Sequence, residues 1–197
     1  MPERDWNEHY KSGTPPWETG QPSAELARVI AEEKITPCRV IELGCGSGIN
    51  AVWLAQQGFD VTALDFNELA IAKARRRADE AGCSVRFVQA DVLDFDEPYE
   101  PFPFFFDRGC YHAVRDPGAA AYVRTLQKLT SPGSRGLILT GNAREPHVPG
   151  PPVVSEEQLH AELEPAFKIV RLREFRFDTA DAAMPAFLAW SCLLRRE

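Results

Sequence analysis

The sequence has 197 residues, of which 44% are hydrophobic and 26% charged, proportions typical of a folded globular domain rather than of a disordered chain. Acidic side chains outnumber basic ones by 29 to 22, which argues against a nucleic-acid substrate because proteins that bind phosphates normally present a basic face. No apolar stretch approaches the ~20 residues that a membrane-spanning helix needs, so we expect neither a nucleic-acid partner nor a membrane. The length predicts one domain over residues 1–197.

The N-terminal segment, residues 1–21, combines aromatic side chains with glycine, proline and charge. We predict an irregular arm there, with Trp6 and Trp17 among its anchors. An α/β core is expected over residues 22–197, beginning with a helix that Ser23 caps.

From residue 39 onwards, short apolar stretches alternate with helical ones. The predicted strands are residues 39–43, 59–64, 84–89, 104–106 and 137–140, and the predicted helices between them are residues 49–57, 68–81 and 119–129. Such alternation predicts a parallel sheet with helices on both faces. The basic run Arg75-Arg76-Arg77 is interpreted as a solvated helix face.

The C-terminal part changes character. A capping-box pattern, Ser155-Glu156-Glu157-Gln158, begins one more helix. Residues 167–177 and 187–194 then form two strand-like runs with no helix between them, so they should pair as antiparallel neighbours. The predicted fold class is α/β, a Rossmann-like doubly wound sheet of seven strands, mostly parallel, with an antiparallel C-terminal edge hairpin.

A glycine loop follows the first strand, in the sequence Val40-Ile41-Glu42-Leu43-Gly44-Cys45-Gly46-Ser47-Gly48. Glycines let a strand turn sharply into a helix and let the backbone approach a ligand closely. A dinucleotide site would require glycine where Ile49 stands, and a phosphate-binding loop would require Gly-Lys-Ser/Thr, so neither pattern fits.

Acidic residues close the first three strands. Asp65 stands 21 residues after Gly44, where a carboxylate can accept hydrogen bonds from both hydroxyls of a ribose. Asp91 is placed to meet an adenine amine, and Glu42 lies beneath the glycine loop, near the cationic amino-acid end of a ligand. Three acids around one cleft suit an adenosine cofactor that carries a sulfonium and an ammonium, and they would repel a pyrophosphate.

With these motifs, residues 40–194 resemble the class I S-adenosylmethionine-dependent methyltransferases. Within that class the sequence is similar to the thiopurine and thiol methyltransferase family, through Pro16-Trp17-Glu18-Thr19-Gly20, Asp107-Arg108-Gly109 and Pro149-Gly150-Pro151-Pro152. The resemblance implies that the arm around Trp17 folds over S-adenosylmethionine as a lid and that Asp107 belongs to the cleft wall. The predicted cofactor contacts are Trp17, Glu42, Gly44, Cys45, Gly46, Ser47, Gly48, Asp65, Phe66, Asp91, Val92 and Asp107.

The acceptor of the methyl group should meet the loops after the fourth and fifth strands, because ligands of open α/β sheets lie beyond the carboxyl ends of the strands. A cation beside a thiol raises its thiolate fraction, and Arg115 and Arg144 are the candidates for that role. Tyr111 and His112 are candidate positioning groups or bases.

Several alternatives stay open from the sequence. The acceptor is expected to be a thiol or another soft nucleophile; an O- or N-methyltransferase of a small metabolite, or a non-catalytic S-adenosylmethionine-binding module, is the alternative. The five scattered cysteines favour a reducing compartment, hence the cytoplasm, and no metal site. The expected product is S-adenosylhomocysteine, and the expected oligomeric state is a monomer or weak homodimer.

Overall fold

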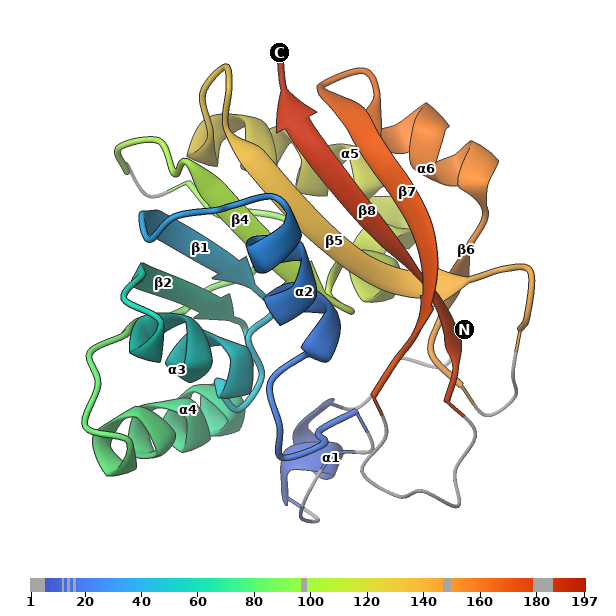
Figure 1. The fold of residues 1–197 in the computed structure, drawn as a ribbon. Helices are drawn as coiled ribbons and strands as arrows, with labels where there is room; N and C mark the ends of the chain where they lie inside the picture. Colours follow the sequence, from blue (N-terminus) through green and yellow to red (C-terminus); the bar gives the residue numbers. More distant parts are fainter. Residues whose placement is uncertain are drawn as a thin grey trace.

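One mixed sheet organises the molecule (Figure 1). The computed structural model describes residues 6–11, 13, 15, 17–96, 99–146, 150–178 and 186–197. Its strands are β1 (Arg39–Leu43), β2 (Asp60–Asp65), β3 (Arg86–Gln89), β4 (Phe104–Arg108), β5 (Arg135–Asn142), β6 (Val153–Val154), β7 (Phe167–Arg176) and β8 (Leu188–Arg196). The order across the sheet is β3-β2-β1-β4-β5-β8-β7, and the two-residue β6 pairs with the end of β5.

This topology confirms the predicted fold class. The first five strands run parallel, and β8 pairs antiparallel with both β5 and β7. The sheet has eight strands rather than seven because Val153 and Val154 add β6 beside Gly141 and Asn142. The last strand of the chain therefore lies inside the sheet, between β5 and the edge strand β7.

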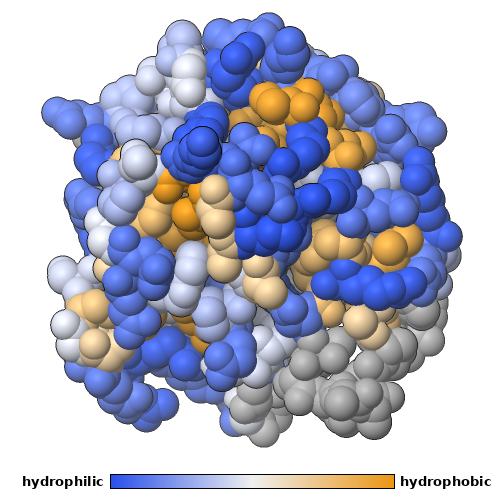
Figure 2. Space-filling view, in the orientation of Figure 1, coloured by the Kyte–Doolittle hydropathy of each residue, from blue (hydrophilic) through white to orange (hydrophobic). Residues whose placement is uncertain are grey.

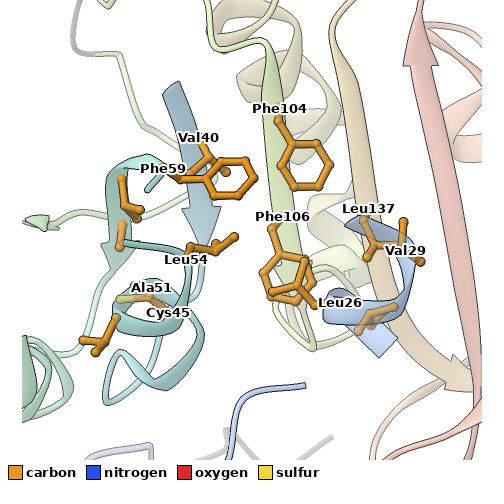
Figure 3. Packing of buried hydrophobic residues seen from close by; sticks show 14 of the residues in the cluster. Leu26, Val29, Val40, Cys45, Ala51, Leu54, Phe59, Phe104, Phe106 and Leu137 are labelled. Carbon is orange, nitrogen blue, oxygen red and sulfur yellow. The ribbon is translucent and has the colours of Figure 1, made fainter. Parts of the chain in front are cut away.

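Helices cover both faces of the sheet (Figure 1). They are α1 (Trp6–Lys11), α2 (Ala24–Glu32), α3 (Ile49–Gln56), α4 (Glu68–Glu80), α5 (Tyr111–Leu129) and α6 (Glu156–Leu163). Apolar side chains of α2, α3 and α4 pack on one face and those of α5 and α6 on the other. Because successive strand residues point to opposite faces, Phe104 and Phe106 join the first core and Phe105 joins the second. Figure 3 shows Leu26 and Val29 of α2 directed at the strands of the first core.

The N-terminal caps of α2 and α6 are the local signals that the sequence predicts for these helices. Ser23 accepts a hydrogen bond from the backbone N–H of Leu26 at 3.4 Å, as an N-cap does. The predicted capping box at Ser155 is present, with Gln158 returning the hydrogen bond. These two helices begin where the sequence predicts.

Two helical predictions are wrong. Residues 1–21 were expected to be irregular, but Trp6–Lys11 forms α1. A six-residue helix has little stability of its own in water, so tertiary contacts rather than a local signal must hold it. The helix expected at 119–129 begins eight residues earlier, at Tyr111, and this shift changes which residues reach the site.

The face of the molecule seen in Figure 2 is largely hydrophilic, and its hydrophobic surface is broken into separate patches. The described residues include no helix with both the length and the apolar character needed to cross a lipid bilayer.

Candidate functional site

A cleft with a volume of about 700 Å³ lies beyond the carboxyl ends of the parallel strands, where open α/β sheets bind their ligands. The segments that follow β1, β2, β3 and β4 form its floor. The arm around α1 and the ends of β7 and β8 form the remaining walls. The site is therefore built from segments distant in sequence that the sheet order brings together.

The glycine loop follows β1, and its backbone needs glycine. Gly44 and Gly46 have φ of 67° and 55°, in the left-handed region that other residues rarely adopt. A Cβ on Gly44 would stand 2.5 Å from the Cβ of Cys110, and one on Gly46 would stand 2.8 Å from the hydroxyl of Tyr10. Glycine at these two positions therefore lets Cys110 and Tyr10 approach the loop backbone directly.

Gly48 is an exception among the predicted cofactor contacts. It is the residue before α3, with φ of 77°, and a Cβ there would stand 2.8 Å from the Cβ of Ala74 on α4. It therefore packs against α4 and does not line the cleft. Gly44, Cys45, Gly46 and Ser47 do line it.

The predicted acids after β2 and β3 both reach the cleft. Asp65 accepts hydrogen bonds from the N–H of Gly46 at 2.8 Å and of Asn67 at 2.9 Å, so its carboxylate fixes the glycine loop and the start of α4 together. Burial raises the pKa of Asp65, and these two bonds oppose the rise. Asp91 accepts a hydrogen bond from the N–H of Leu93 at 2.8 Å.

Two apolar residues that were predicted beside these acids also line the cleft. Phe66, next to Asp65, has 53% of its surface exposed, and Val92, next to Asp91, is buried. An exposed aromatic ring beside an acid gives a ligand a flat apolar surface next to a hydrogen-bond acceptor.

Two acids of the cleft, the buried Glu42 and the half-buried Glu18, each have a buried carboxylate oxygen without a hydrogen-bond partner. Glu42 accepts a hydrogen bond from the amide of Asn50 at 3.3 Å through Oε1, whereas its Oε2 has none. The pKa of Glu42 is raised to about 8, chiefly by burial and also by the nearby Asp107 and Asp65, against the lowering effect of the hydrogen bond from Asn50. Oε1 of Glu18 is likewise buried and unpartnered. Because a buried carboxylate oxygen without a partner is costly, the pair fits a cationic ligand.

Arg108 is the sole lysine or arginine among the described residues that line the cleft. It donates a hydrogen bond to the carbonyl of Trp17 at 3.1 Å, and its guanidinium lies 5.0 Å from the ring centroid of Phe177. Burial lowers the pKa of Arg108, an effect opposed by Asp178 and Glu42. Arg108, at the end of β4, therefore connects the arm to the segment that follows β7.

Aromatic side chains line the cleft near Arg108. Trp17 packs edge-on against Trp6 at 5.1 Å and against His9 at 4.9 Å between ring centroids. Phe177 and Phe187, at the ends of β7 and β8, line the same cleft. Acids lie among these rings as well, because Glu18 follows Trp17 and Asp178 follows Phe177 in the chain, and both acids line the cleft.

Three of the four predicted catalytic residues lie outside the cleft. Tyr111 donates a hydrogen bond to Glu162 of α6 at 2.6 Å, and Arg115 is paired with the same carboxylate. The two residues stand four apart on α5, on one face of the helix, and that face packs on α6. They join two helices and do not line the cleft.

Arg144 is the third. Its guanidinium pairs with Glu156 at 2.7 Å and Glu174 at 3.0 Å and lies over the ring of Trp190. Its side chain is 59% exposed, so it ties surface elements together outside the cleft.

His112 does line the cleft. Its Nδ1 accepts a hydrogen bond from the N–H of Gly141 at 3.0 Å. A neutral imidazole that accepts at Nδ1 carries its proton on Nε2. Of the two roles left open for His112, this arrangement favours positioning by a hydrogen-bond donor over acting as a base.

Asp107, predicted as part of the cleft wall, lies behind it. Its carboxylate is fully buried and accepts hydrogen bonds from the N–H groups of Cys110 and Tyr111 and from the hydroxyl of Tyr122 at 2.7 Å. Burial raises its pKa to about 7. Asp107 therefore starts α5 and does not line the cleft, which corrects the expectation.

Several cleft residues were not among the predicted site residues. They include Tyr10, Glu18, Asn50, Arg108, Phe177, Asp178 and Phe187. Glu18 and Arg108 belong to the short motifs that carry the family resemblance, so a signal existed for both. Pro16 and Pro149 of those motifs lie outside the described residues.

Known proteins resemble this chain in sequence. The family model for thiopurine S-methyltransferase matches residues 1–186. A 2-heptyl-1-hydroxyquinolin-4(1H)-one methyltransferase of Mycobacteroides abscessus is 30% identical over 148 residues, 74% of this chain. A thiopurine S-methyltransferase of Shewanella pealeana is 30% identical over 143 residues, 65% of this chain. The match spans 65% of the length of each of these two curated relatives.

A solved structure resembles nearly the whole chain. It comes from work on the conversion of a disulfide bond into a thioacetal group during echinomycin biosynthesis. The two chains superpose with a TM-score of 0.85 at 25% identity, over 98% of this chain and 92% of the other.

Proposed function

Because the chain belongs to the thiopurine S-methyltransferase family, we propose that it transfers the methyl group of S-adenosylmethionine to a small-molecule acceptor, a thiol or another soft nucleophile. The product of the cofactor is then S-adenosylhomocysteine. The relatives include a thiopurine S-methyltransferase, and the structural neighbour comes from sulfur chemistry as well, which supports a sulfur acceptor.

The charge of the cleft carries the proposal. Five carboxylates among the described residues line it, against the single guanidinium of Arg108. They are Glu18, Glu42, Asp65, Asp91 and Asp178. When bound, S-adenosylmethionine supplies an electrophilic methyl group on a sulfonium, and it also carries an ammonium. An acidic cleft attracts such a cation and would repel a pyrophosphate or a nucleic-acid backbone.

The chain's own residues divide the binding of the cofactor among them. Glu42 and Glu18 each have a free oxygen for an ammonium. Asp65 retains lone pairs for ribose hydroxyls beyond the two backbone bonds that it accepts. Asp91 is the acceptor for an adenine amine, and Phe66 offers its exposed ring to the base.

The acceptor is then bound beside the aromatic residues near Arg108, and Arg108 takes the role that was predicted for Arg115 and Arg144. A guanidinium beside a thiol stabilises the thiolate, the reactive form. Trp17, Phe177 and Phe187 exclude water around it. Joining an anion to a cation destroys charge, so a dry site favours the reaction, and holding the two reactants in line supplies further acceleration.

Binding of the cofactor should release a proton near neutral pH. With a pKa of about 8, Glu42 is mostly protonated at pH 7 in the free protein, and an ammonium beside it would lower that pKa. Proton loss on binding means that affinity rises with pH up to about 8 and is constant above it. The released proton is taken up by the buffer, and phosphate and Tris differ in their heats of protonation. Calorimetry of cofactor binding at pH 7 should therefore give different heats in the two buffers, and Glu42→Gln should remove this difference. Equal heats for the unmodified protein would contradict this role of Glu42.

Release of S-adenosylhomocysteine by the purified protein tests the proposed function. The acceptor panel is small thiols, a thiopurine, selenide, a phenol and a small amine. Release that requires a thiol or selenide supports the proposal. Release with the phenol or amine instead would support the second candidate, an O- or N-methyltransferase. The relative that methylates a hydroxyquinolone is the observation that favours this second candidate. Absence of cofactor binding by calorimetry would refute both.

The surroundings of the reaction are part of the proposal. We propose a single domain, a small-molecule partner and a monomer or weak homodimer. The net charge of −7 argues against a nucleic-acid partner. All five cysteines are free, which supports a reducing compartment such as the cytoplasm.

A further inference from the structure

Helix α4 contacts two walls of the cleft, the glycine loop that follows β1 and the arm around α1. Three consecutive arginines lie on it and were interpreted as a solvated face. Arg76 fits that interpretation, being 72% exposed and 4.0 Å from Glu80. Arg77 does not: its Nε donates to the carbonyl of Ser47 at 2.9 Å, and its Nη2 donates to the Ser47 hydroxyl at 3.3 Å. Ser47 is a residue of the glycine loop and lines the cleft.

A second contact seats the same loop on the same helix. Ala74 lies one turn before Arg77, and its Cβ would stand 2.8 Å from a Cβ on Gly48. The loop therefore rests directly on α4 at Gly48 and is held by two hydrogen bonds at Ser47. A planar guanidinium with fixed donors suits this double contact better than a flexible ammonium does.

The opposite wall, the arm, is attached to α4 through Lys73. Its ammonium donates to the carbonyls of Tyr10 and Gly13, each at 2.9 Å, and lies 5.5 Å from the ring centroid of Tyr10. Tyr10 is in the last turn of α1, where a cation satisfies open carbonyls and complements the helix dipole. Asn67, the N-cap of α4, adds a hydrogen bond to Asn7 at 2.8 Å.

The two walls meet closely. A Cβ on Gly46 would stand 2.8 Å from the hydroxyl of Tyr10 and 3.8 Å from Oε1 of Glu18. The arm thus places a hydroxyl and an unpartnered carboxylate oxygen directly over the glycine loop. The distance between the arm and the glycine loop depends on how each is attached, and both are attached to α4.

We propose that Arg77 and Lys73 are positioning residues that fix the glycine loop and the arm to α4, so that this helix sets the gap in which the cofactor binds. The inference rests on the proposed function, since it assigns these residues to the same cofactor site. Neither residue lines the cleft, so each acts through the wall that it holds. The charge-assisted hydrogen bonds at stake correspond to a loss of about tenfold or more in affinity for each residue.

The test measures the Kd of S-adenosylhomocysteine by calorimetry for Arg77→Met and Lys73→Met, with Arg76→Met as the matched control. We expect the first two to raise Kd about tenfold and the control to leave it unchanged. Arg77→Lys should recover only part of the loss, because it keeps the charge but not the two fixed donors. Thermal unfolding of each variant separates weakened binding from a weakened fold.

Hydrogen exchange in the ligand-free proteins distinguishes the loss of one attachment, which speeds exchange locally, from a general loss of stability, which speeds it throughout the chain. Arg77→Met should speed exchange in the glycine loop and leave α1 unchanged, and Lys73→Met should do the reverse. Unchanged Kd for both variants, or equal acceleration throughout the chain, would overturn the proposal. If the unmodified protein binds no S-adenosylhomocysteine, the proposed function fails instead.

Discussion

Asp65→Ala is expected to raise the Kd of S-adenosylmethionine by about 10²-fold or more, since hydrogen bonds to a charged group contribute about 1.5–3 kcal/mol each. The carboxylate at this position ties Gly46 to Asn67 and is the proposed acceptor for the ribose hydroxyls. Its loss removes the ligand contact and loosens the loop at the same time. Calorimetry with S-adenosylmethionine in the absence of an acceptor gives the value directly.

The control for Asp65 lies on the same strand. Asp60→Ala removes an exposed carboxylate from the opposite end of β2, so it should leave Kd unchanged. Asp65→Asn separates the two roles of the carboxylate, because it keeps one oxygen acceptor and removes the charge. Normal affinity in Asp65→Ala would contradict the assignment of the cofactor.

Arg108→Met is expected to lower kcat/KM for an alkyl thiol by about 30-fold at pH 7, since a thiol with a pKa near 8.5 is only a few per cent ionised there. The loss should shrink as the pH rises towards 9, where the thiol ionises without help. A thiol of lower pKa should be less affected at every pH. Initial rates across pH 6.5–9 with two thiols of different acidity test this relation.

Arg108 also holds the carbonyl of Trp17, so a structural effect must be separated from the effect on the thiol. Arg108→Lys keeps the positive charge and should retain most of the activity at neutral pH. A loss in Arg108→Met that is the same at pH 7 and pH 9 would contradict the stabilisation of a thiolate and leave Arg108 as a tie between the arm and the core.

The strands β1, β2 and β3 could be predicted because each of them ends near a signal that is local in the sequence. Glycines follow β1, and acids close β2 and β3, so the order of elements also located the acids Asp65 and Asp91 of the cleft. Helix α1 carried no comparable signal. Its position depends on Lys73 and Asn67, which lie some 60 residues away in sequence, and no local pattern reports such contacts.

The acceptor half was harder because a small error in one helix redirects every side chain on it. The helix was expected to begin only at residue 119, directly after Pro117-Gly118, a pair that is unfavourable inside a helix. The buried carboxylate of Asp107 starts α5 at Tyr111 instead. With 3.6 residues per turn, His112 then faces the cleft while Tyr111 and Arg115 turn towards Glu162.

Arg144 was misplaced for a related reason. The fifth strand was expected to end at residue 140, but β5 continues to Asn142 and pairs there with β6. Asn142 then accepts a hydrogen bond from the N–H of Arg144 at 2.8 Å, and the turn directs the guanidinium to Glu156 and Glu174. The end of β5 is fixed by its pairing with β6. Because β6 consists of only two valines, the sequence pattern does not reveal it as a strand.

The position of β8 also sets the order in which the molecule can assemble during synthesis. Strand β5 leaves the ribosome with β4 available on one side, but its other long edge has no strand to pair with until residues 188–196 emerge. Strand β7 waits for the same segment. Until then two apolar edges are open to pairing with other chains. A nascent chain arrested before Leu188 should therefore aggregate or recruit chaperones, and one released after Arg196 should not.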